Sequence, residues 1–305
     1  MSSDLLNVTI IGAGVFGGYH INKAKENSLV GSVAIFDMDM ARASRIAREK
    51  GLLVHPTLEA AYAASDAVII ATPAPDHGTR VLEALEAGCH CLVEKPLAHS
   101  LELAERITKL AKTKNLIVHV GHQERFVLSA IGIDKIGEKP KIMELYRENL
   151  ANIRGTDVSV TLDLTVHDLD MAIWLMGEEP LGAMASGSST VSDFIDDLKA
   201  ELIFDKGKVR IITSRTATKQ RREIKLSYVS GGEIIIDFTN RRLTNTTSHN
   251  VNMDWQSHPL AKDPLAASDG AFYSSIKGID ADLIGAEDGK HAVGWALEIE
   301  RLIDL

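Results

Sequence analysis

Three side chains of this sequence could take the proton from an alcohol while its carbon is oxidised. Lys95 stands in the string Glu94-Lys95-Pro96, directly after a run that ends at Val93. Asp163 and His167 are four residues apart and would share one face of a helix. A partly desolvated lysine beside a cationic ring loses its proton more easily than in water, and histidine titrates near neutral pH. Taken singly, each also fits an ordinary structural role, as a surface lysine at a turn, a helix cap or a hydrogen-bonded histidine.

A strand, a glycine-rich turn and a helix follow one another near residue 10. Val8 to Ile11 is an apolar run, Gly12-Ala13-Gly14-Val15-Phe16-Gly17 comes next, and a helix is expected from Tyr19 to Glu26. Gly12 would allow a sharp turn, Gly14 leaves room for a pyrophosphate at the backbone, and Gly17 lets the helix pack closely on the sheet. The pyrophosphate of a dinucleotide would lie at the helix N-terminus, where free N–H groups and the helix dipole favour negative charge.

An acidic residue indicates which dinucleotide is bound. A second apolar run, Val33 to Phe36, ends in Asp37, twenty residues after Gly17. An acid at this place can accept hydrogen bonds from both ribose hydroxyls of the adenosine half, and it repels a 2′-phosphate. A glycine turn formed for steric reasons alone is the alternative, but the coincidence of strand, helix and acid argues against it. We therefore expect NAD rather than NADP.

Strands and helices alternate up to residue 121, which predicts a doubly wound parallel sheet. Expected helices include 41–50, 58–64, 77–87 and 100–112, and expected strands include Val54, 67–70, 90–93 and 116–120. Ligands of such sheets bind beyond the carboxyl ends of the strands. The loop from Thr72 and Pro73 to His77, and the string that contains Lys95, should therefore face the cofactor. Residues 1–121 are predicted to form an NAD-binding Rossmann domain.

The pattern changes to long alternating runs after residue 121, which is typical of antiparallel strands. The expected strands are 141–147, 184–190, 200–204, 209–214, 223–228 and 233–239, with helices at 162–176 and 269–283 over one face of their sheet. A long loop is expected at 245–264, and a last helix at 291–303 after Gly289. Residues 122–305 thus form the second part of an α/β fold, a C-terminal α/β domain with a large, mostly antiparallel open sheet.

Composition narrows the class of protein. A length of 305 residues suggests two domains, and a net charge of −9 argues against a nucleic-acid partner. No leader and no apolar run of membrane-spanning length is apparent, so we expect a cytoplasmic protein without a membrane partner. Cys89 and Cys91 would share one face of a strand as reduced, buried thiols, and no metal site is expected.

Taken together, Lys95, Asp163 and His167 make the chain resemble the Gfo/Idh/MocA oxidoreductases over nearly its whole length. The matching pieces are the turn 12–17, Asp37 with Arg42, the loop 71–77, Glu94-Lys95-Pro96, residues 121–126 and residues 163–170. In that family the residues corresponding to these three surround the sugar or polyol carbon that exchanges hydride. The resemblance also implies a dimer or tetramer formed through the open sheet, and hence a homodimer or homotetramer here.

Two strings look most like the family branch that oxidises the 3-hydroxyl of UDP-N-acetylglucosamine: Gly121-His122-Gln123-Glu124-Arg125-Phe126, and 162–170. That branch continues with Asn-Pro after the phenylalanine, whereas Val127-Leu128-Ser129 follows here. The implied cofactor contacts are Gly12, Gly14, Val15, Phe16, Gly17, Asp37, Arg42, Thr72, Pro73, His77 and Glu94. The implied substrate contacts are Lys95, Glu124, Arg125, Asp163 and His167. For a diphosphate the candidates are Arg125, Arg147 and Arg154, which are equally expected as ordinary ion-pairing arginines.

The expected activity is NAD-dependent oxidation of a secondary hydroxyl of a sugar, preferably a nucleotide-activated amino sugar. Either His167 or Lys95 would accept the hydroxyl proton while Asp163 fixes the geometry. We favour Lys95 as the group that touches the oxygen and His167 as its relay partner, a choice that the sequence leaves open. An inositol or aldose dehydrogenase would share all three residues. A non-catalytic NAD- or sugar-sensing protein on the same fold is the alternative of another class, which the joint presence of the three residues disfavours.

Overall fold

The computed structural model describes residues 5–150 and 158–303, and the chain divides into two compact units. Unit 1 comprises residues 1–123 and 263–290, and unit 2 comprises residues 124–262 and 291–305. The sequence pattern predicts a single domain for 122–305, whereas in the structure residues 263–290 belong to unit 1. The reason is hydrophobic: Phe272 and Tyr273 are fully buried in the unit 1 core beside Leu6, Val8 and Ile21.

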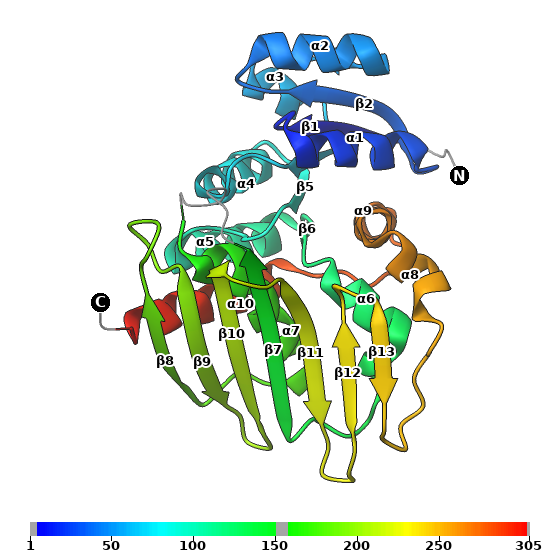
Figure 1. The fold of residues 1–305 in the computed structure, drawn as a ribbon. Coiled ribbons are helices and arrows are strands. Elements are labelled where there is room, and N and C mark those ends of the chain that lie inside the picture. Colours follow the sequence, from blue (N-terminus) through cyan, green and yellow to red (C-terminus); the bar gives the residue numbers. More distant parts are fainter. Residues whose placement is uncertain (1–4, 151–157, 304–305) are drawn as a thin grey trace. The chain divides into compact units, whose positions relative to one another are not determined.

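Unit 1 contains a six-stranded parallel sheet, as predicted, in the order β3-β2-β1-β4-β5-β6 (Figure 1). Its strands are β1 (Leu6–Ile11), β2 (Val30–Phe36), β3 (Leu53–Val54), β4 (Ala67–Ile70), β5 (His90–Val93) and β6 (Val118–Val120). β1 pairs with β2 on one side and β4 on the other, so the strand order reverses there. At such a switch point loops diverge to opposite faces and leave a crevice at the carboxyl edge of the sheet.

Several helices of unit 1 begin or end at capping residues that the sequence provides. They are α1 (Val15–Glu26), α2 (Met40–Lys50), α3 (Leu58–Ala63), α4 (His77–Glu86), α5 (Leu101–Lys114) and α9 (Pro264–Ile276), with a short 3₁₀ turn at Ala74–Asp76. The side chains of Thr57 and Ser100 accept backbone N–H groups at the starts of α3 and α5, as the sequence suggested. Gly51 ends α2 with φ of 68°, a left-handed conformation that glycine adopts without strain.

Two sequence expectations about helices were wrong. The helix expected at 269–283 over the second sheet is α9, which lies in unit 1 and packs against α1. The last helix was expected after Gly289, but α10 (Ala286–Arg301) contains this glycine. A Cβ at position 289 would lie 2.9 Å from Val120 Cγ2 and 3.0 Å from Leu97 Cβ. Close packing therefore explains a glycine that the sequence pattern marked as a break.

Unit 2 is built on a seven-stranded sheet in the order β13-β12-β11-β7-β10-β9-β8. Its strands are β7 (Ile142–Leu150), β8 (Gly182–Ser188), β9 (Asp197–Ile203), β10 (Lys208–Ala217), β11 (Arg221–Ser227), β12 (Glu233–Asp237) and β13 (Arg242–Asn245). Only β7 and β10 are parallel among the described pairs, which confirms the mostly antiparallel sheet. The expected loop at 245–264 contains a 3₁₀ turn (Trp255–Ser257) and α8 (Pro259–Lys262).

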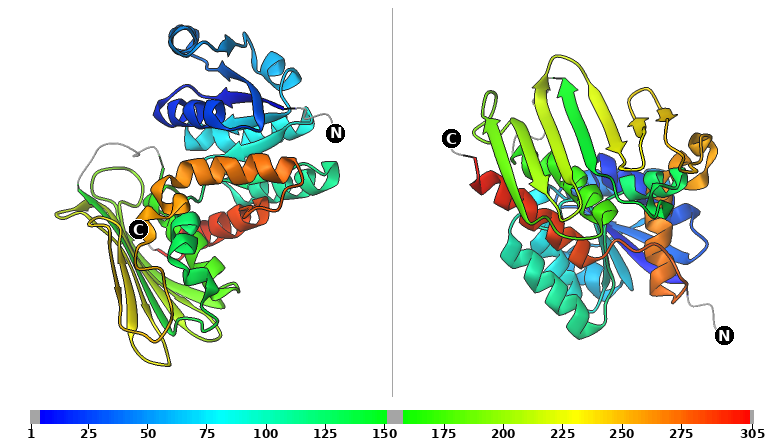
Figure 2. Two further views of the ribbon diagram at one scale, coloured as in Figure 1. Left: turned by 90° about the vertical axis from the view of Figure 1, so that its right-hand side faces the viewer. Right: turned by 90° about the horizontal axis from the view of Figure 1, so that it is seen from below.

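Helices cover one face of this sheet. Figure 2 shows α6 (Glu124–Ile131), α7 (Val166–Met176) and the C-terminal part of α10 on the same side of the strands. A 3₁₀ turn (Ile133–Lys135) follows α6, and a π-helical turn (Thr161–Thr165) precedes α7. None of the helices within the described ranges combines the length and apolarity needed to cross a membrane.

The other face of the sheet carries a row of alternating charges. Glu233, Lys225, Glu144, Arg210 and Glu201 come from β12, β11, β7, β10 and β9 in spatial order. Lys225 Nζ lies 2.8 Å from Glu233 and 3.9 Å from Glu144, and Arg210 lies 3.7 Å from Glu144 and 2.8 Å from Glu201. Each acid thus meets a base on the neighbouring strand, an arrangement that supports the observed pairing register.

Candidate active site

The glycine turn of unit 1 has the shape that a dinucleotide requires. Gly12 has φ of 98°, and a Cβ at Gly17 would lie only 1.9 Å from the Gly12 carbonyl oxygen. At Gly14, which precedes the first residue of α1, a Cβ would meet nothing within 4 Å. The side chains of Val15 and Phe16 are exposed beside this opening. The helix N-terminus is therefore accessible to an anionic group, with N–H donors that have no partner inside the helix.

Asp37 is fixed directly after β2, and its carboxylate can accept more hydrogen bonds than those the protein donates to it. The N–H of Ala13 donates to Asp37 Oδ2 at 2.7 Å, and the N–H of Asp39 donates to Oδ1 at 2.7 Å. Arg42 Nη1 lies 3.5 Å from the same Oδ2. A carboxylate has about four accepting positions, so the two fixed oxygens can also accept from ribose hydroxyls. The residues of this turn fit the adenosine half of NAD.

The loop after β4 contributes an unpartnered polar atom. Thr72 Oγ1 is buried and has no hydrogen-bond partner among the residues that the structure describes, which leaves it for a ligand. His77 is buried, with Nδ1 2.8 Å from the Pro96 carbonyl oxygen and Nε2 2.9 Å from that of Thr72. The His77 ring thus joins the loops that follow β4 and β5. Its contribution to a cofactor site would be to hold these loops, since its nitrogens face the protein.

Glu94, at the end of β5, is part of a buried ion cluster. His20 from α1 places Nε2 3.0 Å from Glu94 Oε1 and Nδ1 3.0 Å from Asp269 of α9. Gln123 also donates to Glu94 Oε1, at 3.3 Å. Burial would lower the pKa of His20, but the charges and hydrogen bonds of Asp269 and Glu94 outweigh it and raise the pKa to about 10. An imidazolium between two carboxylates therefore fixes the residue next to Lys95.

Lys95 directly follows β5 at the carboxyl edge of the unit 1 sheet, and its side chain is half-buried. The peptide bond from Lys95 to Pro96 is cis. Asp163 and His167 belong to unit 2. Asp163 lies in the π-helical turn and is half-buried, while His167 stands in the first turn of α7. π-Helical turns inside helices often mark functional positions, and no feature of the sequence pattern predicted this one.

Glu124 lies at the centre of a buried charge network in unit 2. Its Oε2 is 2.9 Å from His167 Nδ1, and its Oε1 is 3.2 Å from Arg147 Nη1 and 2.5 Å from Arg222 Nη2. Arg147 also forms bonds of 2.9–3.2 Å with Asp168. Burial would raise the pKa of Glu124, but His167 and the two arginines outweigh it and hold the pKa well below its ordinary value. Glu124 is thus ionised and directly in contact with a predicted catalytic residue.

The arginines predicted for a diphosphate already have carboxylate partners. Arg125 is buried and forms a two-pronged ion pair with Asp170, at 2.8 and 2.5 Å, beneath the ring of Trp174. Arg147 is buried between Glu124 and Asp168. Arg154 lies outside the described residues. Charge neutralisation inside unit 2 is therefore the observed role of Arg125 and Arg147, and their contact with substrate stays a prediction.

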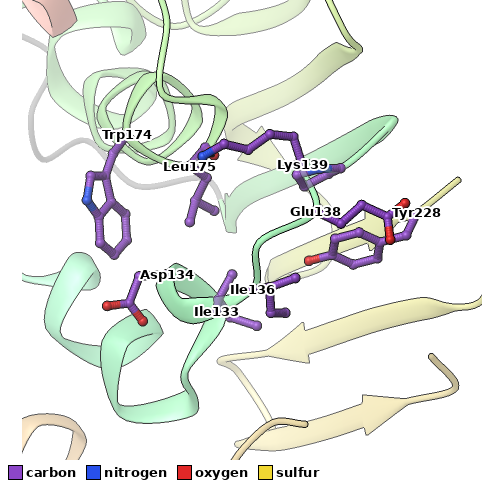
Figure 3. Close-up of a pocket in the computed structure, with 9 residues that line it drawn as sticks. Ile133, Asp134, Ile136, Glu138, Lys139, Trp174, Leu175 and Tyr228 are labelled. Atoms are coloured by element: carbon purple, nitrogen blue, oxygen red, sulfur yellow. The ribbon is translucent and has the colours of Figure 1, made fainter. Parts of the chain in front are cut away.

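Unit 2 contains a cavity whose volume is too small for a sugar molecule (Figure 3). Its volume is about 50 Å³, and it is lined by Ile133, Asp134, Ile136, Glu138, Lys139, Pro140, Trp174, Leu175 and Tyr228. Lys139 Nζ donates to the Leu175 carbonyl oxygen at 2.8 Å and so completes the C-terminus of α7. The space is that of one or two water molecules. Among the described residues, no group of three or more His, Cys, Asp and Glu side chains could hold a metal ion.

The sequence pattern did not indicate the roles of His20, Asp269 and Arg222. His20 and Asp269 are separated by 249 positions, and Arg222 and Glu124 by 98. None of these residues stands in a motif, and their roles come only from the partners that the fold brings to them. A histidine on the helix after the glycine turn was the one available signal, and it has many ordinary explanations.

Known proteins that are similar to this chain show the family to which it belongs. A family model described as the oxidoreductase family with an NAD-binding Rossmann fold, Gfo/Idh/MocA, matches residues 6–122. The chain is 31% identical to UDP-N-acetylglucosamine 3-dehydrogenase of Acidithiobacillus ferrooxidans, over 97% of this chain and 96% of the relative. A solved structure of that enzyme superposes with a TM-score of 0.88 at 27% identity, covering 98% of this chain and 97% of the other.

A myo-inositol 2-dehydrogenase of Thermotoga maritima is 27% identical over 98% of both chains. These relatives are dehydrogenases that the chain matches over nearly its whole length, so the similarity is not limited to the cofactor domain. The chain is thus an NAD-dependent oxidoreductase, and it belongs to the Gfo/Idh/MocA family.

Proposed function

We propose that this enzyme oxidises the 3-hydroxyl of a nucleotide-activated amino sugar, UDP-N-acetylglucosamine or a close analogue. The observation that carries the proposal is the 31% identity to UDP-N-acetylglucosamine 3-dehydrogenase over 97% of the chain. The strings Glu94-Lys95-Pro96 and Asp163 to His167 supply the side chains for such chemistry. A myo-inositol dehydrogenase is the second candidate, supported by the 27% identity over 98% of the chain.

The proposed cofactor site uses the carboxyl edge of the unit 1 sheet. Gly12, Gly14 and Gly17 shape the turn. The backbone N–H groups at the start of α1, at Val15 and Phe16, face the pyrophosphate. Asp37, with Arg42 beside it, accepts from the adenosine ribose. Thr72 and Pro73 belong to the next loop, which His77 holds in place. His20 fixes Glu94, the residue before Lys95. NAD supplies the hydride acceptor, and the protein has to orient the sugar and move one proton.

The proposed proton route uses Lys95 and His167. Lys95 touches the substrate oxygen, and His167 takes up the proton as its relay partner while Asp163 orients the reacting group. Glu124 and Arg125 contribute through the side chains that they hold, His167 and Asp170 respectively. Neither residue has to leave its buried ion pair for this role.

We also propose a homodimer or homotetramer that works in the cytoplasm, where NAD and nucleotide sugars occur. The sheet face that carries the charge row supports self-association. Among the described residues, no helix of unit 2 covers this face (Figure 2). A groove of about 360 Å³ on this sheet is lined by residues of β8, β9 and β10, with Met184 and Ile212 beside Lys199 and Glu201. A two-fold interface would bring this same surface of two copies together, with acids and bases on both sides.

The test of function is NADH formation at 340 nm with UDP-N-acetylglucosamine, myo-inositol, glucose and galactose, measured separately. Lys95→Met and His167→Ala remove the two proton-handling groups, and Lys112→Met on the exposed side of α5 is the matched control. We expect turnover of the nucleotide sugar in the wild type and the control only. Loss of a positioned proton acceptor typically costs about 10²- to 10⁴-fold in rate.

The other outcomes are equally specific. Turnover of myo-inositol without turnover of the nucleotide sugar would replace the first candidate by the second. Tight NAD binding without reduction by any of the four compounds would favour the sensing protein. Full activity of His167→Ala would remove this residue from the proton route.

A further inference from the structure

Glu124 has a contact that the proposed reaction does not yet explain. Its carboxylate lies 2.9 Å from Nδ1 of His167, although the two residues come from different helices, α6 and α7. The Glu124 side chain is only 7% exposed, and that of His167 14% exposed. A buried carboxylate that faces one nitrogen of an imidazole decides where the proton of that ring resides.

The chemistry of the contact defines a tautomer. An ionised carboxylate can only accept hydrogen bonds, and a lone pair on Nδ1 would be repelled by the Glu124 oxygen 2.9 Å away, so this contact favours the proton on Nδ1 of His167. In the neutral ring, Nε2 then holds the lone pair and is the atom that can accept a proton. The other carboxylate oxygen is occupied by Arg147 at 3.2 Å and Arg222 at 2.5 Å, which keep Glu124 ionised and fix its orientation.

We propose that Glu124 is a positioning residue that keeps His167 in the Nδ1–H tautomer and so presents Nε2 as the proton acceptor. This inference rests on the proposed function of His167 in the proton route. When Nε2 takes up the substrate proton, the ring becomes an imidazolium with its positive charge next to the Glu124 carboxylate. The same carboxylate thus orients the base before the reaction and stabilises its charged form afterwards.

Several charged groups share this environment. Glu124 faces His167 from α6, Arg147 from β7 and Arg222 from β11 contact Glu124, and Asp168 on α7 pairs with Arg147. Asp163 lies one turn before His167. With His167 in its neutral form, as proton uptake requires, two arginines offset two carboxylates, Glu124 and Asp168. Proton uptake by His167 therefore adds one positive charge to a balanced cluster, and its neighbour Glu124 determines how easily this occurs.

Glu124→Gln tests the proposal because an amide cannot serve both sides of the network. Arg147 and Arg222 both donate to the same oxygen, so the amide oxygen will turn to them and its NH₂ group to His167. Nδ1 must then accept, and the proton moves to Nε2. We expect the variant to invert the tautomer of His167, to lower kcat at least about 10²-fold, and to shift the acid limb of the pH profile to lower pH, with NAD affinity unchanged.

Long-range ¹H–¹⁵N spectra of the full-length protein with ¹⁵N-labelled histidine read the tautomer directly. His119 and His90 are internal references for the opposite tautomer, since Nδ1 of each accepts a backbone N–H, from Ile284 and Ile117. His167→Ala assigns the signal. A wild-type His167 with its proton on Nε2 overturns the proposal without any variant, as does a Glu124→Gln spectrum that keeps the Nδ1–H form.

Activity toward UDP-N-acetylglucosamine separates this inference from the proposed function. If His167→Ala is inactive while Glu124→Gln keeps wild-type kcat and pH profile, the role of Glu124 is refuted and that of His167 stands. If His167→Ala is fully active, the proton route itself fails, and with it the proposal. Glu124→Asp, which keeps the charge on a shorter side chain, should restore the Nδ1–H tautomer and part of kcat, whereas a purely packing role of Glu124 predicts no such rescue.

Discussion

The ion cluster of unit 1 predicts a specific dependence of stability on pH. His20 donates from both ring nitrogens, to Glu94 and to Asp269, and these partners raise its pKa from 6.5 to about 10 against the effect of burial. The native state therefore keeps a proton on His20 over a pH range in which the unfolded chain has released it. A group of this kind stabilises fully below its unfolded pKa, and the stabilisation is lost as the pH rises toward the folded pKa.

The magnitude follows from the two pKa values. The interval between 6.5 and about 10 corresponds to at most about 5 kcal/mol of unfolding free energy, present below pH 6.5. Between these limits the free energy should fall by up to about 1.4 kcal/mol per pH unit. His20→Gln removes the titrating group, so this slope should flatten. The variant should also be less stable at pH 6.5, because Glu94 and Asp269 stay buried without a cation, at a cost of about 3–5 kcal/mol.

The chain contains convenient reporters for each unit. Its two cysteines, Cys89 and Cys91, are buried in unit 1, and its three tryptophans, Trp174, Trp255 and Trp295, lie in unit 2. Pulsed thiol labelling in urea therefore follows the unfolding of unit 1, while tryptophan fluorescence follows unit 2.

We expect the thiol-labelling midpoint of the wild type to fall from pH 6.5 to 9.5, and that of His20→Gln to change much less. His99→Gln, an exposed histidine of unit 1, is the matched control and should follow the wild type. Parallel pH slopes for wild type and His20→Gln would refute the assignment of a buried imidazolium at this position.

Three further predictions concern the cofactor turn and the core of unit 2. Gly14→Ala should weaken NAD binding at least about tenfold, because the new Cβ occupies the space left for the pyrophosphate. It should not reduce stability, because this Cβ meets no protein atom within 4 Å. Gly18→Ala, where a Cβ is equally unobstructed, should bind NAD normally, and calorimetry that finds equal affinities for the two variants would contradict the prediction. Asp37→Asn should reduce the free energy of NAD binding by about 1.5–3 kcal/mol and raise the affinity for NADP relative to NAD. An unchanged ratio of the two dissociation constants would be evidence against the ribose contact. Arg125→Met leaves Asp170 buried without a cation and should lower the unfolding free energy of unit 2 by about 3–5 kcal/mol. Tryptophan fluorescence in urea measures this loss. A loss below about 1 kcal/mol would mean that the ion pair is dispensable.

Local patterns in the sequence predict much of unit 1. β4 and β5 occur at their predicted bounds, because strands buried on both faces appear as short continuous apolar runs. The caps at Thr57 and Ser100 and the left-handed end at Gly51 are likewise local chemistry. Each of these features depends on residues within a few positions, so a single sequence is sufficient to predict it.

Features that depend on distant partners were not predictable in this way. Glu124 and His167 were both expected near the substrate, but their direct contact depends on how α6 and α7 pack in unit 2. The helix pattern around residue 270 was visible, yet its place in the unit 1 core became evident only through the burial of Phe272 and Tyr273. Gly289 appeared as a helix break because its packing partners, Val120 and Leu97, lie about 170 and 190 positions earlier.

The late position of α9 in the chain also has a consequence during translation. The ribosome must release residues 124–262, most of unit 2, before residues 263–290 can complete unit 1. At about 5–20 residues per second, this interval lasts roughly 10–30 s. During that time the nascent chain carries His20 and Glu94 without Asp269, and the surface of α1 without Phe272 and Tyr273. Unit 1, although it begins the chain, can therefore be completed only after most of unit 2 has been made, and residues 291–305 then complete unit 2.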